Sequence, residues 1–295
     1  MRIGVDWGGT KIEAIVLSDD GATLWRQRVP TPRDDYTASV SATVDLIRRA
    51  ETETGSPGTI GIGIPGVIAQ STGLVKNANS TWLIGKPFKA DIESRLGREI
   101  RCANDANCLA LSEATDGAGA GKRVVFAVIL GTGCGGGIAI DGAIHEGPHA
   151  VAGEWGHNPL PWQTADEYPG PQCYCGRRGC IETWISGTSF ERQYAELTGQ
   201  RLRAPQIVER VESGDRGAAE LLSRYQDRLA RALAHVVNLL DPDIIVLGGG
   251  MSNVTRLYNV LPQRVDDYVF GHGGKVTVVP AMHGDSSGVR GAAWL

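Results

Sequence analysis

Apolar residues recur along the chain in two spacings, one typical of strands and one typical of helices. Alternating or continuous apolar runs predict strands at 3–5, 12–17, 24–29, 59–64, 100–103, 124–130, 138–140, 244–247 and 275–280. Spacings of three and four predict helices at 37–54 and 88–96, after Asp105 to about 115, from Thr188, from Pro205, at 215–240 and 254–269, and from about 286. Strands that alternate with helices in both halves predict an α/β fold.

Three of the predicted strands end in glycine-rich turns. The first strand ends in Asp6 and is followed by Gly8-Gly9-Thr10-Lys11; the other turns are 131–137 and 248–250. Glycine lets a ligand approach the backbone, and hydroxyl and ammonium groups are natural phosphate contacts. Asp6 is placed to hold a hydrated Mg²⁺ beside that phosphate. The alternative is an ordinary hairpin in which Asp6 caps the turn, because short glycine motifs also occur by chance.

The first two glycine turns lie in different halves of the chain, which predicts a nucleotide bound between two related domains. Neither turn is a P-loop, because neither has the spacing G-x-x-x-x-G-K-[ST] before a helix. The glycine-rich stretch 116–121 lacks periodicity and is the predicted hinge. We therefore expect an N-terminal α/β domain at 1–118 and a C-terminal α/β domain at 119–295.

Composition narrows the function classes. The 295 residues are 42% hydrophobic and 21% charged, which is ordinary for a globular protein. A net charge of −4 gives no support to nucleic-acid binding. Apolar runs such as 124–130 are too short to span a bilayer, and no basic and apolar leader precedes the first strand. We expect a cytoplasmic protein with neither a nucleic-acid nor a membrane partner.

Three cysteines are crowded into one segment, at Cys173, Cys175 and Cys180. A structural zinc ion usually has four ligands, so this segment lacks one. His157 is the nearest upstream candidate, and His145 and His149 are the alternatives. Free buried thiols or a redox pair would also account for the cysteines. Cys-x-Cys with a third cysteine in a reducing compartment favours a metal site.

Acidic residues near these motifs are candidates for chemistry on hydroxyl groups. Asp105 follows a strand and precedes a helix, so it either caps the helix or accepts a proton from a substrate hydroxyl. Asn104 beside it is placed to hold a neighbouring hydroxyl. Glu154 and Glu182 flank the cysteine segment. Carboxylates that accept two hydroxyl hydrogens commonly grip sugars; the alternative is a pair of surface acids.

Together these motifs resemble the signature set of the ROK family of sugar kinases and repressors. The matching segments, which cover nearly the whole chain, are Asp6-x-Gly-Gly-Thr-Lys11, Asn104-Asp-Ala-Asn107, Gly131-Thr-Gly-x-Gly-Gly-Gly137, Gly153-Glu-x-Gly-His157 and Cys173-x-Cys-Gly-x-x-Gly-Cys180. Segments 30–33, 76–83 and 283–294 are most similar to the bacterial fructokinase (mannofructokinase) branch. The resemblance implies a two-domain actin-like ATPase fold, related to ribonuclease H. It also implies ATP-dependent phosphorylation of D-fructose to fructose 6-phosphate, with mannose as a second substrate to test.

The resemblance also implies a role for each matching residue. Asp105 is the expected general base, and the expected sugar contacts are Gly66, Asn104, Glu154, His157 and Glu182. The expected ligands of a structural Zn²⁺ are His157, Cys173, Cys175 and Cys180. The expected ATP and Mg²⁺ positions are Gly4, Asp6, Gly8, Gly9, Thr10, Lys11, Thr132, Gly133, Gly135, Gly248, Gly249 and Gly250. The segment 162–171 reads as an inserted loop between His157 and Cys173, because this interval is longer than in many family members.

The same resemblance leaves rival functions. An N-acetylglucosamine or glucose kinase on the same scaffold is the nearest alternative. What distinguishes such a kinase from a fructokinase is the shape of the sugar pocket. A sugar-sensing repressor is disfavoured, because the first strand starts at Arg2 and leaves no room for an N-terminal helix-turn-helix. We further expect the last helix to pack back on the N-terminal domain, and the chain to form a homodimer.

Overall fold

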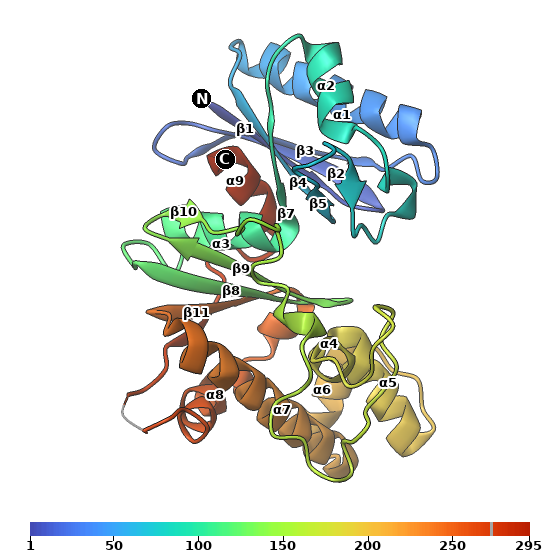
Figure 1. The fold of residues 1–295 in the computed structure, drawn as a ribbon, viewed down its shortest axis with the longest axis vertical. Helices are drawn as coiled ribbons and strands as arrows, with labels where there is room; N and C mark the ends of the chain where they lie inside the picture. The colour runs from blue at the N-terminus through green and yellow to red at the C-terminus, as the bar shows by residue number, and fades with distance from the viewer. Residues whose placement is uncertain (272–273) are drawn as a thin grey trace.

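The structure is a computed structural model that describes residues 1–271 and 274–295 (Figure 1). It contains two five-stranded sheets with the same pattern of connections. The order in the first sheet is β3 (Thr23–Pro30), β2 (Lys11–Leu17), β1 (Arg2–Trp7), β4 (Thr59–Ile64) and β7 (Arg101–Asn104). The order in the second sheet is β10 (Ala143–Ile144), β9 (Cys134–Ile140), β8 (Val124–Leu130), β11 (Ile244–Gly248) and β12 (Val278–Pro280). The predicted α/β class is confirmed.

Each sheet pairs its first three strands in antiparallel fashion and then adds two parallel strands. Parallel strands need a crossover connection, which the helices supply. A small separate ribbon, β5 (Val67–Ile68) with β6 (Val75–Lys76), follows β4. The described residues also form the 3₁₀ turns η1 (Thr81–Leu83), η2 (Trp155–His157), η3 (Gly250–Asn253) and η4 (Gly284–Ser286). In the described part of the chain, no helix is both long and apolar enough to cross a membrane.

The first sheet is covered on both faces. Helices α1 (Tyr36–Thr54) and α2 (Phe88–Leu96) lie on one side, and α9 (Ser287–Trp294) packs on β1 and β4 from the other (Figure 1). The approach of α9 is close enough to need glycine in the strands. A Cβ on Gly4 would lie 2.2 Å from the Val289 carbonyl oxygen, and one on Gly61 would lie 1.9 Å from that of Ala292.

Helix α3 (Asp105–Thr115) lies between α9 and the second sheet. Glycines permit this arrangement on both sides of the helix. A Cβ on Gly291 of α9 would lie 1.7 Å from the Cys108 carbonyl oxygen, and one on Gly137 of β9 would lie 2.2 Å from the Ala106 carbonyl oxygen. The N-terminus of α3 is therefore fixed at the junction of the two sheets, and Asp105 is its first residue.

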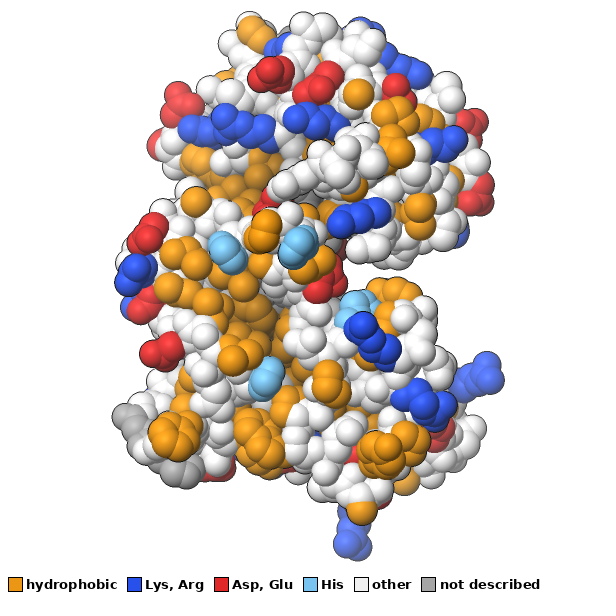
Figure 2. All heavy atoms as spheres, viewed as in Figure 1, with side chains coloured by type: hydrophobic (Ala, Val, Ile, Leu, Met, Phe, Trp, Pro, Cys, Tyr) orange, Lys and Arg blue, Asp and Glu red, His pale blue; other side chains and the backbone are white. Residues whose placement is uncertain are grey.

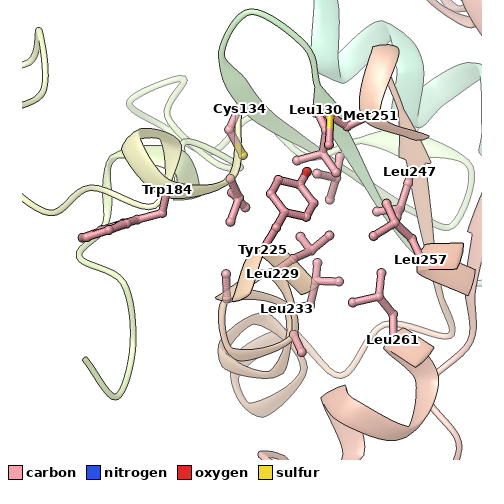
Figure 3. Packing of buried hydrophobic residues seen from close by; sticks show 14 of the residues in the cluster. Leu130, Cys134, Trp184, Tyr225, Leu229, Leu233, Leu247, Met251, Leu257 and Leu261 are labelled. Atoms are coloured by element: carbon pink, nitrogen blue, oxygen red, sulfur yellow. The ribbon is translucent and has the colours of Figure 1, made fainter. Parts of the chain in front are cut away.

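The other face of the second sheet packs on a group of helices. They are α4 (Glu182–Ile185), α5 (Gly187–Thr198), α6 (Ala204–Glu212), α7 (Arg216–Leu240) and α8 (Arg256–Asp266). Figure 3 shows Tyr225, Leu229 and Leu233 of α7 meeting Leu247 of the sheet and Leu261 of α8. The apolar side predicted for the helix at 215–240 is therefore the side of α7 that makes this contact.

The start of α5 differs from the sequence prediction. A capping box formed by Thr188 and Glu191 is typical of a helix that begins at Thr188. The structure instead caps α5 with Ser186, whose Oγ accepts a hydrogen bond from the Ser189 backbone nitrogen at 3.1 Å. Glu191 accepts from the Ala204 backbone nitrogen at 3.0 Å and so joins α5 to the start of α6. The prediction missed the short helix α4 before this cap.

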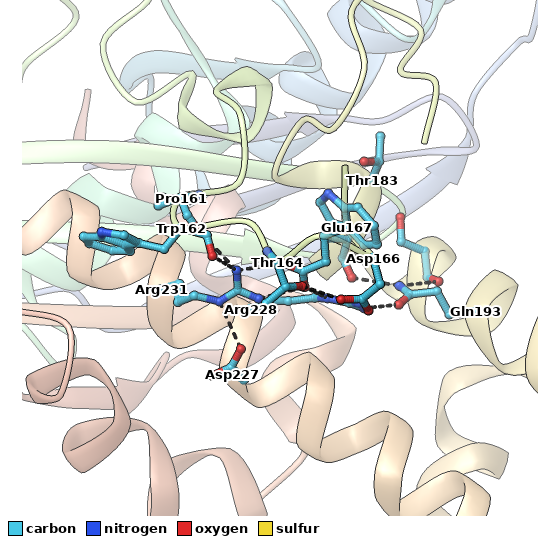
Figure 4. A network of polar contacts seen from close by, with 12 residues as sticks. Pro161, Trp162, Thr164, Asp166, Glu167, Thr183, Gln193, Asp227, Arg228 and Arg231 are labelled. Atoms are coloured by element: carbon cyan, nitrogen blue, oxygen red, sulfur yellow. Dashed lines mark hydrogen bonds and ion pairs between the residues drawn. The ribbon is translucent and has the colours of Figure 1, made fainter. Parts of the chain in front are cut away.

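The inserted loop is anchored to α7 by a buried carboxylate (Figure 4). Glu167 is 4% exposed, and its Oε1 accepts from Arg228 Nε and from Arg231 Nη2, both at 2.7 Å. Arg231 Nη1 also donates to the carbonyl oxygens of Pro161 and Trp162. Burial alone would raise the pKa of Glu167, but hydrogen bonds from the two arginines outweigh it and lower the pKa to about 2.

A Glu167→Gln variant should be destabilised by about 3 to 5 kcal/mol, because the buried Arg228 loses its counter-charge and the buried Arg231 keeps only its pair with Asp227. Measured by urea unfolding, the difference in free energy of unfolding between the wild type and the variant should stay constant from pH 7 to pH 5. Because the folded pKa of Glu167 is about 2 and its ordinary value is 4.5, the difference should shrink as pH falls below 4.5. The control is Glu196→Gln, which alters an exposed pair with Arg192 and should change stability little. Equal losses in both variants would contradict the anchoring role.

Candidate active site and metal centre

Four of the predicted metal ligands come together in the structure. The ligand atoms of His157, Cys173, Cys175 and Cys180 all lie within 4.8 Å of one another. Cys173 Sγ is 3.5 Å from His157 Nδ1, and the sulfurs of Cys175 and Cys180 are 3.6 Å apart. A tetrahedral zinc ion with ordinary Zn–S and Zn–N bonds places such atoms about 3.5 to 3.8 Å apart. The cluster therefore fits zinc, and His145 and His149 lie outside it.

Short backbone contacts bring His157 to the cysteines despite the inserted loop. The Leu160 nitrogen donates to the Gly179 carbonyl oxygen at 3.0 Å, and the Ile181 nitrogen donates to that of Asn158 at 2.8 Å. The loop therefore leaves and returns at neighbouring points. Gly179, with φ of +70°, lies at the turn before Cys180, where a side chain would be strained. The long interval between His157 and Cys173 thus does not displace His157.

The second ring nitrogen of His157 faces away from the cluster. Its Nε2 is 2.9 Å from the Tyr174 hydroxyl, and the two rings meet edge to face with centroids 5.1 Å apart. Desolvation of the Tyr174 hydroxyl and the negative charges of Glu182, Cys173 and Glu154 raise its pKa to about 12. Tyr174 therefore stays neutral and lies within electrostatic reach of both candidate sugar carboxylates.

Asp105 lies beside other acids where the two sheets meet. Asn104, and not Asp105, is the N-cap of α3, and its Oδ1 accepts from the Ala106 nitrogen at 2.8 Å. Asp105 Oδ1 accepts from the same nitrogen at 2.8 Å. Burial raises the pKa of Asp105, and the charge of Glu154 raises it further, against the lowering effect of the Ala106 hydrogen bond. The helix is thus capped by a different residue, which leaves Asp105 available for chemistry.

Asp6 belongs to the same group of acids. Burial and the charges of Asp105 and Glu13 raise its pKa to about 6, against the opposing charges of Lys11 and Arg28. Asp6 and Asp105 come from the first sheet and the helix after it, whereas Glu154 comes from the segment after β10. Figure 2 shows a hollow between the two halves of the molecule, with acidic and histidine side chains at its edges.

Glu182 connects the cysteine segment to the second glycine turn. Its Oε2 accepts from the Cys134 nitrogen at 2.9 Å. A Cβ on Gly133 would lie 2.5 Å from the same oxygen, so this position has no room for a side chain. Glu182 lies two residues after Cys180, so the candidate metal centre and the glycine turn are held in one unit.

The first glycine turn is tight and exposes its polar end. The Gly8 nitrogen donates to the Lys11 carbonyl oxygen at 3.0 Å, and a Cβ on Gly9 would lie 2.9 Å from Ser80 Oγ. Thr10 and Lys11 are exposed at the tip. This geometry is consistent with the predicted phosphate contacts, whose role stays a prediction.

The second and third glycine turns border one cavity of about 390 Å³. Its lining includes Thr132 and Gly250, which were predicted as nucleotide positions. It also includes residues of α5, α6 and the turns before them, which the sequence reasoning missed: Gly187, Thr188, Glu191, Arg203, Ala204 and Pro205. No local motif marks these residues, because they reach the cavity only through the packing of α5 and α6.

Several predicted glycine positions have a structural explanation. Gly4 lies under α9, whereas a Cβ on Gly135 would make an ordinary contact, 3.5 Å from the Ala106 Cβ on α3. A Cβ on Gly248 would lie 2.9 Å from Leu109, and Gly249 has φ of +80°. A Cβ on Gly66 would lie 2.7 Å from the Lys76 carbonyl oxygen. We therefore do not carry Gly4 into the nucleotide site proposed below.

Two mixed sheets with matching topology, joined around α3, define a two-domain actin-like fold. Solved structures agree: the ROK hexokinase from Thermus thermophilus superposes with a TM-score of 0.88 at 30% identity, covering 99% of this chain and 96% of that one. A ROK family glucokinase from Streptomyces griseus, in complex with glucose and AMPPNP, gives a TM-score of 0.81 at 30% identity, with coverages of 99% and 97%.

The sequence comparisons extend over the whole chain. A family model described as "ROK family" matches residues 2–295. A Pectobacterium atrosepticum protein named "N-acetyl-D-glucosamine kinase" is 41% identical over 299 residues, which cover 100% of this chain and 98% of that protein. The chain belongs to the ROK family.

Proposed function

We propose that this protein is an ATP-dependent sugar kinase that phosphorylates the 6-hydroxyl of N-acetyl-D-glucosamine. The observation that carries the substrate is the 41% identity, over the full chain, to a protein with that name. The fructokinase interpretation rested on three short segments, at 30–33, 76–83 and 283–294. Similarity over the full chain is the stronger guide, so we put N-acetyl-D-glucosamine in place of fructose.

In this proposal the sugar lies between the two domains. Asp105 accepts the proton of the 6-hydroxyl, whose oxygen then attacks the γ-phosphate of ATP. The raised pKa of Asp105 suits a general base, because it brings the carboxyl nearer to neutral pH. Asn104, Glu154, His157 and Glu182 hold the other sugar hydroxyls. The burial of Asp105 beside Glu154 supports this arrangement.

In this proposal ATP binds between the same two domains, on the other side of the γ-phosphate from the sugar. The cavity beside Thr132 and Gly250 takes the nucleoside. The turn that carries Thr10 and Lys11 faces the phosphates, and Asp6 holds Mg²⁺, which supplies positive charge to the phosphate oxygens. Zinc in the His157 cluster is structural, because four protein ligands leave no open position for a substrate.

Initial rates with ATP and four sugars test the substrate assignment. We expect kcat/KM for N-acetyl-D-glucosamine to exceed that for glucose, mannose and fructose by at least about tenfold, because a site built around a polar substituent rejects sugars that lack it. A highest value for fructose would restore the fructokinase interpretation within the same reaction class. Failure to phosphorylate any of the four sugars would contradict the kinase proposal itself.

A further inference from the structure

Tyr174 lies between two of the zinc-site cysteines, and its hydroxyl meets the nitrogen of His157 that the proposed sugar also needs. The separation between Tyr174 Oη and His157 Nε2 is 2.9 Å. The opposite nitrogen, Nδ1, faces Cys173 Sγ at 3.5 Å and so belongs to the metal cluster. The two ring nitrogens therefore have separate partners.

The chemistry of this contact matches that of a sugar hydroxyl. A histidine that binds a metal through Nδ1 carries its proton on Nε2, and that N–H group is almost always hydrogen-bonded. With a metal on Nδ1, Nε2–H would donate to the tyrosine oxygen, which lies 2.9 Å away in the sugar-free protein. The tyrosine hydroxyl also has a hydrogen of its own to donate, as a sugar hydroxyl does. A sugar hydroxyl on His157 would accept and donate in the same way.

The side chain of Tyr174 is held in place by little else. It is 83% exposed. Among the described residues, the contact with His157 is the hydrogen bond that its hydroxyl makes. The backbone on both sides is fixed by Cys173 and Cys175, so the ring can leave His157 by side-chain rotation alone. Tyr174 is therefore an exposed side chain whose contacts are with His157, next to a histidine that belongs to the metal cluster.

We propose that Tyr174 is a gate on the sugar site, which caps His157 in the empty enzyme and is displaced by the incoming sugar. This inference rests on the proposed function, because it takes His157 as a sugar contact. Only molecules with the gate open can bind sugar at His157, so the apparent affinity is reduced by the open fraction. Tyr174 thus sets the sugar affinity without contributing to the chemical step.

The test is a Tyr174→Phe variant, assayed with whichever sugar the wild-type enzyme phosphorylates best. Losing one exposed hydrogen bond should lower the KM for that sugar about 2- to 10-fold, with kcat changed less than twofold and zinc content unchanged. Isothermal titration without ATP should show the same gain in sugar affinity. The control is Tyr168→Phe, which removes a similarly exposed hydroxyl (the residue is 76% exposed) from the inserted loop and should leave KM unchanged.

The outcomes separate the gate from the proposed function. A higher KM in Tyr174→Phe would make the hydroxyl a sugar contact, and an unchanged KM would mean that it does not compete; either overturns the gate. Loss of zinc from this variant would assign Tyr174 to the metal centre and also overturn it. If the wild-type protein neither binds nor phosphorylates any sugar, the proposed function fails, irrespective of the variant.

Discussion

An Asp105→Asn variant should lose kcat by about 10²- to 10⁴-fold while its stability stays close to that of the wild type. Asparagine has nearly the shape of aspartate but cannot take the proton from the attacking hydroxyl. The start of α3 should survive the change, because Asn104 caps the helix independently of Asp105. Steady-state kinetics and thermal unfolding, measured on the same preparation, check both halves of this expectation.

A matched control comes from the start of α7. Asp215 caps that helix, and its Oδ1 accepts from the Ala218 nitrogen at 3.0 Å. Asp215→Asn makes the same chemical change at a helix start outside the proposed site, and kcat should not change. The Asp105→Asn variant should still bind the sugar, as measured by isothermal titration. A variant that retains most of its kcat would rule out the general base.

The fold was predictable from sequence where the hydrophobic period is strong. The long helix at 215–240 and the strand at 124–130 match α7 and β8, because each presents one continuous apolar surface to the core. The strand predicted at 275–280 shortens to β12 at Val278–Pro280. The domain boundary after residue 118 stays a prediction. α9 lies on the first sheet, and α3 contacts elements of both halves.

The metal cluster was predictable because its chemistry is local. Three cysteines within one short segment require a fourth ligand. The backbone contacts that bring His157 to these cysteines join residues close to His157 and Cys180 in sequence. The capping alternative for Asp105 could not be decided from sequence, because Asn104 and Asp105 are equally good caps. Only the structure separates their roles.

The cavity that we propose for the nucleotide was only partly predictable, because glycine has two uses that look identical in a sequence. It permits approach of a ligand, and it permits approach of another helix. At Gly4 the structure gives the second use, in a contact with α9. The other walls of the cavity come from α5 and α6, whose residues near Thr188 and Pro205 lie far along the chain from the turns they face.

Cys175→Ala should remove the zinc and weaken sugar binding, while ATP binding changes little. Metal analysis should find about one zinc ion per chain in the wild type and almost none in the variant. The KM for the sugar should rise by about 10- to 100-fold, because the zinc fixes the orientation of His157, and Glu154 and Glu182 lie close to its ligands in sequence. The cavity proposed for the nucleotide lies at α5 and α6, so nucleotide affinity should change less than threefold.

The control for the metal is a cysteine outside the cluster. Cys102→Ala removes a thiol within β7 and should leave the zinc content at the wild-type level. Two results would break the link between metal and sugar: active wild-type protein that contains no zinc, or Cys175→Ala with an unchanged sugar KM. The link is expected because the segment from 145 to 181 has little regular structure beyond η2. Its shape therefore depends on the cluster and on the Glu167 anchor, and losing the cluster frees the end that carries His157.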